Sequence, residues 1–431
     1  MSRPSGLTRV GTGGMRGRLL AAFVALTAAT ALTACSAGTN AQWQQGEPVP
    51  EPEAAKLVFS HDDGAVDVSP GQPVSVQVID GVLETVSLSS NVGEVPGVLS
   101  EDQLWWRSLE DLEFGKTYTL AVSSLGEDGE PVEESRSFST VDVKVGDFWN
   151  VFLNTTGDYL GRPLDGGTWG IGQPIVARFD DSVDQRVAEQ TLTVTTNPAV
   201  EGSWYWMSDR EAHWRPQNYW APGTQVTVEA KVLGVSLSTP DGRQLHGQEN
   251  KKATFTIGQA KVAKISNSTK HMLVYFDGQV VKDIPVSMGR EQSYLGSNGV
   301  WYDWRTPSGV MVVTEKQHPV LMKPDLPKED PEYYEEKIDL AVRITNSGIY
   351  VHSAPWTTPG PGQTWGQGFT NMSHGCINVS SANAQWFYDN FGPGDVVEVV
   401  GAGNPVNVRD GLGDWNMPWD QWVAGSALAN G

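Results

Sequence analysis

The chain has 431 residues, a length that predicts two to four domains. Its 47 glycines, 26 prolines and 17 tryptophans, with little helical patterning, predict mostly β structure. The formal net charge of −21 argues against a nucleic-acid partner, which needs a basic face, and is consistent with solubility outside the cytoplasm.

The first 34 residues are predicted to form a secretory signal peptide. Four arginines precede an apolar run at residues 19–32, which is too short for a confident membrane span. The sequence Leu-Thr-Ala-Cys at residues 32–35 looks like a lipobox, in which the signal is removed before a lipid-bearing cysteine. We therefore expect removal of residues 1–34 and a lipid on Cys35 that anchors the protein on the outer face of the cell membrane. The alternative is ordinary cleavage nearby, with Cys35 discarded or unmodified.

Residues 35–54 are predicted to be a tether rich in proline and glutamate. The sequence Glu-Pro-Val-Pro-Glu-Pro-Glu at residues 47–53 cannot bury a core. It is expected to run extended, at roughly 3 Å per residue where it is polyproline-like.

Between residues 55 and 258 one unit occurs twice. Gly-Gln-Pro at residues 71–73 recurs at 172–174, and a Trp-Arg pair recurs at 214–215 after its first occurrence at 106–107. Short alternating runs separated by Gly, Pro and Asp predict two β-sandwiches, at residues 55–142 and 143–258. Core packing is the commoner explanation for their tryptophans, and a sugar-stacking surface is the alternative.

Residues 259–401 are predicted to form a further β-rich domain. Asp-Gly at residues 277–278 is a strong hairpin signal, and Ser380 or Ser381 is predicted to cap a helix that ends near Asn390. Strands are predicted at residues 262–265, 272–276, 280–288, 310–314, 338–345, 349–352 and 395–400. The charged, proline-rich segment 316–336 is predicted to be a mobile flap over a cleft.

Cys376 is the only cysteine besides Cys35, so an oxidising exterior leaves it free to react. A cysteine attacks a carbonyl as the thiolate and therefore needs a base or an electropositive setting. His352 and His374 are both candidate bases. Gly375 permits a close backbone approach, so the turn around it could aim N–H groups at an oxyanion.

Two other interpretations of this cluster remain open. Cys376 could be a small buried hydrophobic residue. His352, His374 and Cys376 could also supply three zinc ligands, with water as the fourth.

Longer motifs around Cys376 carry a family resemblance. His-Ser-Ala-Pro-Trp at residues 352–356, followed by Ser-His-Gly-Cys-Ile-Asn at 373–378, resembles the signature of L,D-transpeptidases with a YkuD-type catalytic domain. The resemblance continues through residues 381–388, 394–400, 410–416 and 418–422. The Trp-rich end is similar to the actinobacterial branch, in which immunoglobulin-like domains precede the catalytic one.

This resemblance implies a mainly β fold. Two immunoglobulin-like sandwiches, acting as spacers or wall-contacting modules, would precede a YkuD-type β-rich catalytic domain with a short helix after the catalytic cysteine. The Trp-rich segment 402–431 would pack on the catalytic domain.

The resemblance also assigns catalytic roles. Cys376 would be the nucleophile and His352 its base, with the backbone carbonyl of Ser353 orienting the imidazole. The backbone N–H groups of His374, Gly375 and Cys376 would stabilise the oxyanion.

Further residues would contact substrate. Tyr334, eighteen residues before His352, would line the pocket and assist the oxyanion, although Tyr333 is an adjacent alternative. Met322 and Trp356 would form apolar walls. Asn378 would brace the site through hydrogen bonds.

The implied chemistry is acyl transfer between peptidoglycan tetrapeptide stems. The thiolate would attack the diaminopimelate carbonyl, D-Ala would leave, and a second stem's amine would take the acyl group, giving a 3→3 cross-link. Carbapenem β-lactams would acylate the same sulfur. Neither a cofactor nor a metal is needed.

Three alternative functions remain open from the sequence. Water as acceptor would give an L,D-carboxypeptidase, a metal site would give a zinc hydrolase, and an inactive site would leave a wall-binding lipoprotein.

Overall fold

The computed structural model describes residues 52–157, 161–239 and 242–429. The predicted signal peptide, Cys35 and most of the predicted tether lie outside the described residues. Within these ranges, no helix is both long and apolar enough to cross a membrane.

The first sandwich consists of two antiparallel-rich sheets. One sheet contains, in order, β1 (Lys56–Phe59), β3 (Ser75–Ile79), β7 (Trp105–Ser108) and β6 (Gly97–Leu99). The other contains β2 (Ala65–Val68), β9 (Pro131–Thr140), β8 (Thr117–Gly126), β4 (Gly81–Ser90) and β5 (Gly93–Val95). Strand β8 alternates exposed and buried residues along most of its length, as a half-buried strand should.

The second sandwich repeats this plan with larger sheets. One contains β11 (Val151–Asn154), β13 (Ile175–Phe179), β16 (Glu211–Pro216) and β15 (Gly202–Ser208). The other contains β12 (Thr168–Trp169), β20 (Lys251–Ile257), β17 (Gln225–Ala230) and β14 (Leu192–Asn197). A small sheet of β10 (Phe148–Trp149), β19 (Gln244–Gly247) and β18 (Ser236–Ser238), and helix α1 (Gln185–Gln190), complete it.

Both Trp-Arg motifs place their tryptophan in a sandwich core. Trp106 and Trp214 are 5% and 6% exposed. Gly97 and Gly202 lie directly against these two indole rings, where a Cβ atom would come within 2.1 Å of ring atoms. The repeated tryptophans therefore serve packing, as the commoner explanation predicted.

The predicted catalytic domain has two main sheets. The first contains β23 (Gln279–Pro285), β22 (His271–Phe276), β21 (Lys261–Ser266), β33 (Val396–Val400) and β26 (Gly309–Val312). The second contains β27 (Glu315–Gln317), β30 (Ala341–Arg343), β31 (Tyr350–Ser353) and β32 (Ile377–Val379). Helix α2 (Ser381–Asn390) packs on β30 and β31, and one apolar core joins it to both sheets.

Two local features agree with the turn and cap signals. Asp277 and Gly278 both adopt positive φ, 48° and 80°, which joins β22 to β23. Ser380 caps α2 by accepting a hydrogen bond from the Asn383 amide.

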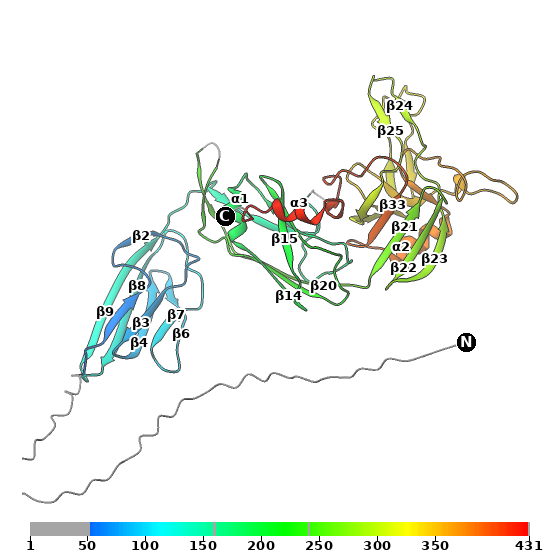
Figure 1. Cartoon of the computed structure of the whole chain (residues 1–431). Helices are drawn as coiled ribbons and strands as arrows, with labels where there is room; N and C mark the ends of the chain where they lie inside the picture. Colours follow the sequence, from blue (N-terminus) through cyan, green and yellow to red (C-terminus); the bar gives the residue numbers. More distant parts are fainter. Residues whose placement is uncertain (1–51, 158–160, 240–241, 430–431) are drawn as a thin grey trace, which may run out of the picture. The chain divides into compact units, whose positions relative to one another are not determined.

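The predicted strand at residues 338–345 is interrupted. Leu340 adopts φ +54°, so β29 (Glu336–Ile338) ends before it and β30 starts after it. Strand β29 pairs instead with β28 (Val320–Met322). A further hairpin, β24 (Ser293–Leu295) with β25 (Trp301–Asp303), projects from the body of this domain (Figure 1).

The C-terminal segment departs from its prediction, because it also packs on the second sandwich. Its 3₁₀ turn (Asp414–Asn416) meets the catalytic domain, where the Asn416 side chain bonds the Val310 amide at 2.7 Å. Helix α3 (Trp419–Ala424), however, contacts β15. The Trp422 indole donates to the Ser203 carbonyl at 2.8 Å. The apolar face of α3 is covered by the sandwich, which explains this placement.

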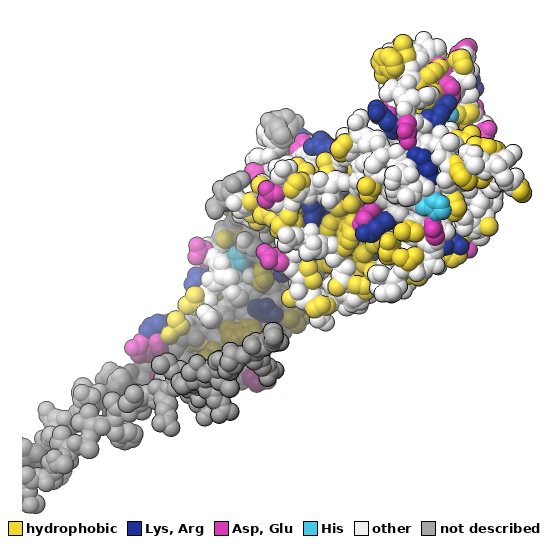
Figure 2. Space-filling view, turned by 45° about the vertical axis from the view of Figure 1, so that its right-hand side comes forward, with side chains coloured by type: hydrophobic (Ala, Val, Ile, Leu, Met, Phe, Trp, Pro, Cys, Tyr) yellow, Lys and Arg dark blue, Asp and Glu magenta, His cyan; other side chains and the backbone are white. Residues whose placement is uncertain are grey.

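Charge is dispersed over the visible surface. On the face shown in Figure 2, the Lys and Arg side chains of the described residues are scattered among acidic and apolar ones. That face presents no continuous basic surface.

Candidate active site

A cleft of about 670 Å³ opens on the catalytic domain beside Cys376. All but one of the residues predicted from the motifs line this cleft. They are Met322, Tyr334, His352, Trp356, His374, Gly375, Cys376 and Asn378. The remaining one, Ser353, is buried and does not line the cleft.

Parallel pairing of β31 and β32 brings the two motifs together. Val351 pairs with Ile377 and His352 with Asn378. Parallel neighbours need a crossover connection, which the chain between the two strands provides. Cys376 directly precedes β32 and therefore lies beside Tyr350, at the start of β31.

His352 is held in one tautomer. Its imidazole is 4% exposed, and Nδ1 donates a hydrogen bond to the Ser353 carbonyl oxygen at 2.9 Å. Because a carbonyl only accepts, the proton lies on Nδ1 and Nε2 keeps its lone pair. Burial lowers the pKa of His352, so the ring is neutral.

Cys376 is also uncharged at rest. Its Sγ lies 3.6 Å from the Gly348 carbonyl oxygen, to which the thiol donates. Burial raises the pKa of Cys376 to about 11, partly offset by the Tyr350 backbone amide. Among the described residues no hydrogen bond joins Sγ to His352, so the resting pair is not an ion pair.

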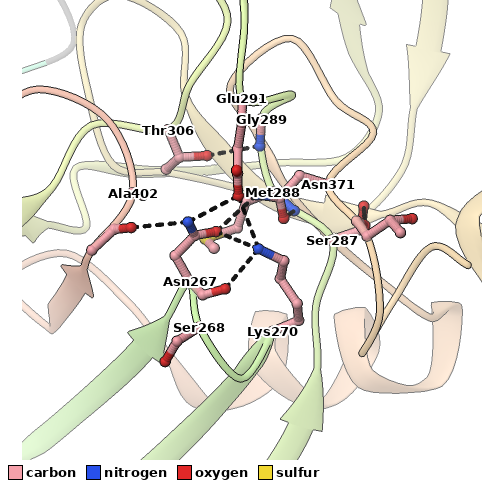
Figure 3. A network of polar contacts seen from close by, with 12 residues as sticks. Asn267, Ser268, Lys270, Ser287, Met288, Gly289, Glu291, Thr306, Asn371 and Ala402 are labelled. Atoms are coloured by element: carbon pink, nitrogen blue, oxygen red, sulfur yellow. Dashed lines mark hydrogen bonds and ion pairs between the residues drawn. The ribbon is translucent and has the colours of Figure 1, made fainter.

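The turn before Cys376 is fixed by two hydroxyl groups. Ser373 Oγ accepts from the Gly375 amide at 3.0 Å and donates to the Cys376 carbonyl at 2.6 Å. Thr306 Oγ1 donates to the Gly375 carbonyl at 2.7 Å and accepts from the Gly289 amide at 2.9 Å (Figure 3). Gly375 adopts φ +133°, which favours glycine.

This bonding changes the set of predicted oxyanion donors. The Gly375 amide is engaged by Ser373. The amides of His374 and Cys376 have no acceptor within the described part of the chain. Two of the three predicted backbone donors are therefore available to a ligand.

Tyr334, rather than Tyr333, lines the cleft. It packs with Met322 and Cys376 in a small apolar cluster, and burial raises its pKa to about 12, so its hydroxyl keeps its proton. The Tyr333 hydroxyl bonds Glu335 at 3.0 Å.

Asn378 and Trp356 differ in burial. Asn378 is 3% exposed, and its backbone exchanges hydrogen bonds with Ser287 at 2.8 and 3.0 Å. Its side-chain Oδ1 is buried without a partner, so the predicted bracing comes from its main chain. Trp356 is 52% exposed, with its ring 6.4 Å from that of His352.

His374 contacts three residues that the motifs do not include. Its Nε2 lies 2.6 Å from an Arg290 guanidinium nitrogen and 3.0 Å from a Glu332 carboxylate oxygen. Its ring stands edge-on to Trp304, at 4.8 Å between centroids. No sequence signal identified these residues, because they are isolated in the sequence and far from His374 along the chain.

The segment predicted as a mobile flap is tied to the β24–β25 hairpin. Asp330 accepts from the Tyr294 hydroxyl and the Ser297 amide, both at 2.7 Å, and Tyr302 donates to the Asp325 carbonyl. Burial opposes the charge of Asp330, but these donors hold its pKa at about 2. The loop over the cleft is therefore anchored at several points.

The zinc interpretation lacks a ligand set. Within the described ranges, no group of three or more His, Cys, Asp and Glu side chains is arranged to hold a metal ion.

Comparisons with known proteins agree with the architecture. Residues 65–236 match the bacterial Ig domain family, and residues 260–399 match the L,D-transpeptidase catalytic domain of the YkuD family. The chain is 39% identical over 391 residues to L,D-transpeptidase 2 of Mycobacterium tuberculosis, covering 89% of this chain and 88% of that one. It is 35% identical over 404 residues to L,D-transpeptidase 5 of the same species, covering 92% and 82%. A solved LD transpeptidase in complex with imipenem is 30% identical, at a TM-score of 0.45, covering 58% of this chain and 99% of that one.

Proposed function

This chain belongs to the L,D-transpeptidases, which cross-link peptidoglycan, and we propose that Cys376 carries the acyl group as a thioester during its reaction. The observation that carries the proposal is the meeting of Cys376 and His352 in one cleft, with His352 Nε2 left free to accept a proton. A nucleophile beside a base that is oriented by a third group is the arrangement required for acyl transfer.

Acylation begins from neutral partners. When a tetrapeptide stem enters, His352 Nε2 takes the thiol proton as Sγ attacks the diaminopimelate carbonyl carbon. The amides of His374 and Cys376, with the Tyr334 hydroxyl, donate to the developing oxyanion. The C–N bond to D-Ala then breaks, and the proton on His352 passes to the departing amine.

Deacylation by a second stem forms the 3→3 cross-link. A neutral side-chain amine attacks the thioester carbonyl, and His352 or His374 accepts the proton that the new ammonium nitrogen loses. The C–S bond then breaks, and the Cys376 thiolate takes that proton back. Water in place of the amine gives a tripeptide. Carbapenems are expected to inhibit by acylating the same sulfur.

We also propose that the mature protein is held at the outer face of the cell membrane through lipid on Cys35. The lipobox-like residues 32–35 support this. In detergent phase partition, we expect the full-length protein to enter the detergent phase and Cys35→Ala to stay in the aqueous phase. Native protein in the aqueous phase would exclude the anchor.

The decisive experiment is mass spectrometry of products formed when residues 36–431 meet a disaccharide-tetrapeptide, with Cys376→Ala alongside. A dimer lighter than two donors by one D-Ala, absent in the variant, is expected. Tripeptide alone would indicate a carboxypeptidase. Unchanged tetrapeptide would point to another substrate or to a binding role.

A further inference from the structure

We propose that Glu332 is a positioning residue that holds a proton on Nε2 of His374, against the competing donor Arg290, and thereby makes His374 the acceptor of the proton released by the attacking amine. This inference rests on the proposed thioester mechanism and assigns its second half-reaction.

The three side chains form one closed triangle. Arg290 and Glu332 make an ion pair at 2.7 Å, with a second contact at 3.3 Å. Nε2 of His374 lies within hydrogen-bond distance of both. The Arg290 guanidinium also stacks on the face of Trp304, with 3.9 Å between its central carbon and the ring centre, and this contact restrains its position. The side chains of all three are only a quarter to a third exposed.

The two partners of Nε2 favour opposite protonation states of this atom. The Glu332 carboxylate only accepts, so it favours a proton on Nε2. The Arg290 guanidinium only donates, so it favours a lone pair on Nε2 and a proton on Nδ1. The tautomer of His374 therefore depends on the balance between two residues that touch the same atom.

The tautomer decides whether the other ring nitrogen of His374, Nδ1, carries a lone pair. Nδ1 has no hydrogen-bond partner within the described part of the chain, and it is not among the atoms buried away from solvent. His374 lines the cleft two residues before Cys376. With the proton on Nε2, donated to Glu332, Nδ1 presents a lone pair and can accept a proton. With the proton on Nδ1, it cannot.

The step balances as follows. The neutral acceptor amine attacks the thioester carbonyl, forming a C–N bond and an alkoxide. Nδ1 of His374 takes one proton from the new ammonium nitrogen. The alkoxide collapses and breaks the C–S bond, and the proton returns from His374 to the Cys376 thiolate. The product amide and the neutral enzyme result, with no co-reactant.

The charges facing His374 come from every element around it. Burial lowers its pKa most, Glu332 raises it, and Arg290 lowers it. Tyr334, with its ring 5.1 Å away, and Cys376 are the other titratable groups beside it, and both stay neutral near pH 7. Removing Arg290 should therefore raise the pKa of His374.

The experiment compares three Met substitutions in residues 36–431. Glu332→Met removes the acceptor, and Arg290→Met removes the competing donor. Glu291→Met is the matched control, because the Glu291 carboxylate belongs to the separate network with Asn267 and Lys270 (Figure 3). Two rates are measured: D-Ala release in the first turnover, and dimer formation from preformed acyl-enzyme as a function of pH.

We expect Glu332→Met and Arg290→Met to change the rate of dimer formation and its pH profile differently. Glu332→Met should slow dimer formation about 10- to 100-fold while leaving first-turnover D-Ala release unchanged. Arg290→Met should keep dimer formation and shift its rising limb to higher pH. The control should match the native enzyme in both. Nitrogen-15 NMR of the neutral His374 ring should show Nε2–H in the native enzyme and in Arg290→Met, and Nδ1–H in Glu332→Met.

Several results would overturn the inference. One is the same His374 tautomer in the native enzyme, Arg290→Met and Glu332→Met. Another is an equal loss of D-Ala release and dimer formation in Glu332→Met, which would indicate a structural role. If Glu332→Met does not fold, the pH shift in Arg290→Met still decides, and an unshifted profile rejects the assignment. Native enzyme that forms no dimer at all would instead reject the proposed function.

Discussion

Cys376, the proposed nucleophile, rests as a neutral thiol in the same cleft as the neutral imidazole of His352. Burial raises the pKa of Cys376 to about 11 and lowers that of His352. About one thiol in ten thousand is then ionised at pH 7. Reactivity toward a stem must therefore arise when the substrate carbonyl and the oxyanion donors are in place.

We predict that alkylation of the free enzyme by iodoacetamide rises continuously with pH toward 11. The reason is that iodoacetamide reacts with the thiolate, and no histidine ion pair supplies it at neutral pH. The measurement is the alkylation rate of residues 36–431 from pH 5 to 11, followed by mass. A plateau between pH 5 and 7 would show a thiolate–imidazolium pair and contradict the neutral resting state.

Position 375 requires glycine because of its backbone conformation, and not because a side chain would clash with its neighbours. Its φ is +133°, yet a Cβ there would meet nothing closer than 3.8 Å. We predict that Gly375→Ala lowers the free energy of unfolding by about 1–3 kcal/mol through backbone strain and abolishes acylation. Gly392→Ala, where a Cβ meets nothing within 4 Å, is the control and should change stability by less than about 1 kcal/mol. Equal effects in urea unfolding would refute this reasoning.

The spacing to His352 predicted Tyr334, and sequence motifs predicted Cys376 and His352, because the last two lie in contiguous signatures. The structure places all three along one cleft. The motifs did not reach Arg290, Glu332 or Trp304. Each of these is one residue in an ordinary context, and only the tertiary fold brings them to His374.

At the scale of elements, Asp330 joins the loop at residues 323–335 to the β24–β25 hairpin. It is 4% exposed and accepts hydrogen bonds from both segments. Its pKa of about 2 lies below the ordinary 3.8, so its stabilising effect is present above about pH 4 and is lost as the pH falls through 2.

We predict that Asp330→Asn loosens the roof of the cleft, because it removes the charge that these donors hold. Hydrogen exchange at pH 7 should accelerate in residues 293–303 and 323–335 but not in α2. The native protein should show the same acceleration only near pH 2. Unchanged exchange in the variant would mean that other contacts hold the loop.

Periodicity and turn chemistry predicted the sandwiches, the β22–β23 hairpin and the cap of α2, because those signals are local. The same reasoning missed the break at Leu340 and the β24–β25 hairpin. A positive φ at leucine is imposed by tertiary packing, and three-residue strands are too short to show alternation.

At the scale of the whole molecule, the C-terminal segment links the catalytic domain to the second sandwich through buried charges. His213, 2% exposed, bonds Asp414 at 2.7 Å and Glu211 at 2.9 Å. Burial alone would lower the pKa of His213, but these carboxylates raise it to about 10.

We predict that this link weakens in alkali. Because the folded pKa exceeds the ordinary 6.5, the contribution is fully present below pH 6.5 and is lost as the pH rises through 10. Native stability should therefore fall from pH 7 to 10, and the gap between native protein and His213→Gln in urea unfolding should narrow. A gap independent of pH would show that His213 is not charged in the fold.

Apolar packing supplies the second part of the same link. Trp422 is fully buried, stacks on Tyr205 at 5.0 Å and lies 4.3 Å from the guanidinium of buried Arg215. We predict that Trp422→Ala costs about 3–5 kcal/mol and splits thermal unfolding into two transitions, because the sandwich and the catalytic domain then lose their shared element. Trp301→Ala, at a residue 68% exposed, should leave unfolding within about 0.5 kcal/mol of native. A single, unshifted transition in Trp422→Ala would mean that other contacts join the two domains, such as the hydrogen bond from the Gly172 amide to the Gly394 carbonyl at 2.8 Å, and that α3 contributes nothing to holding the cleft relative to the sandwich.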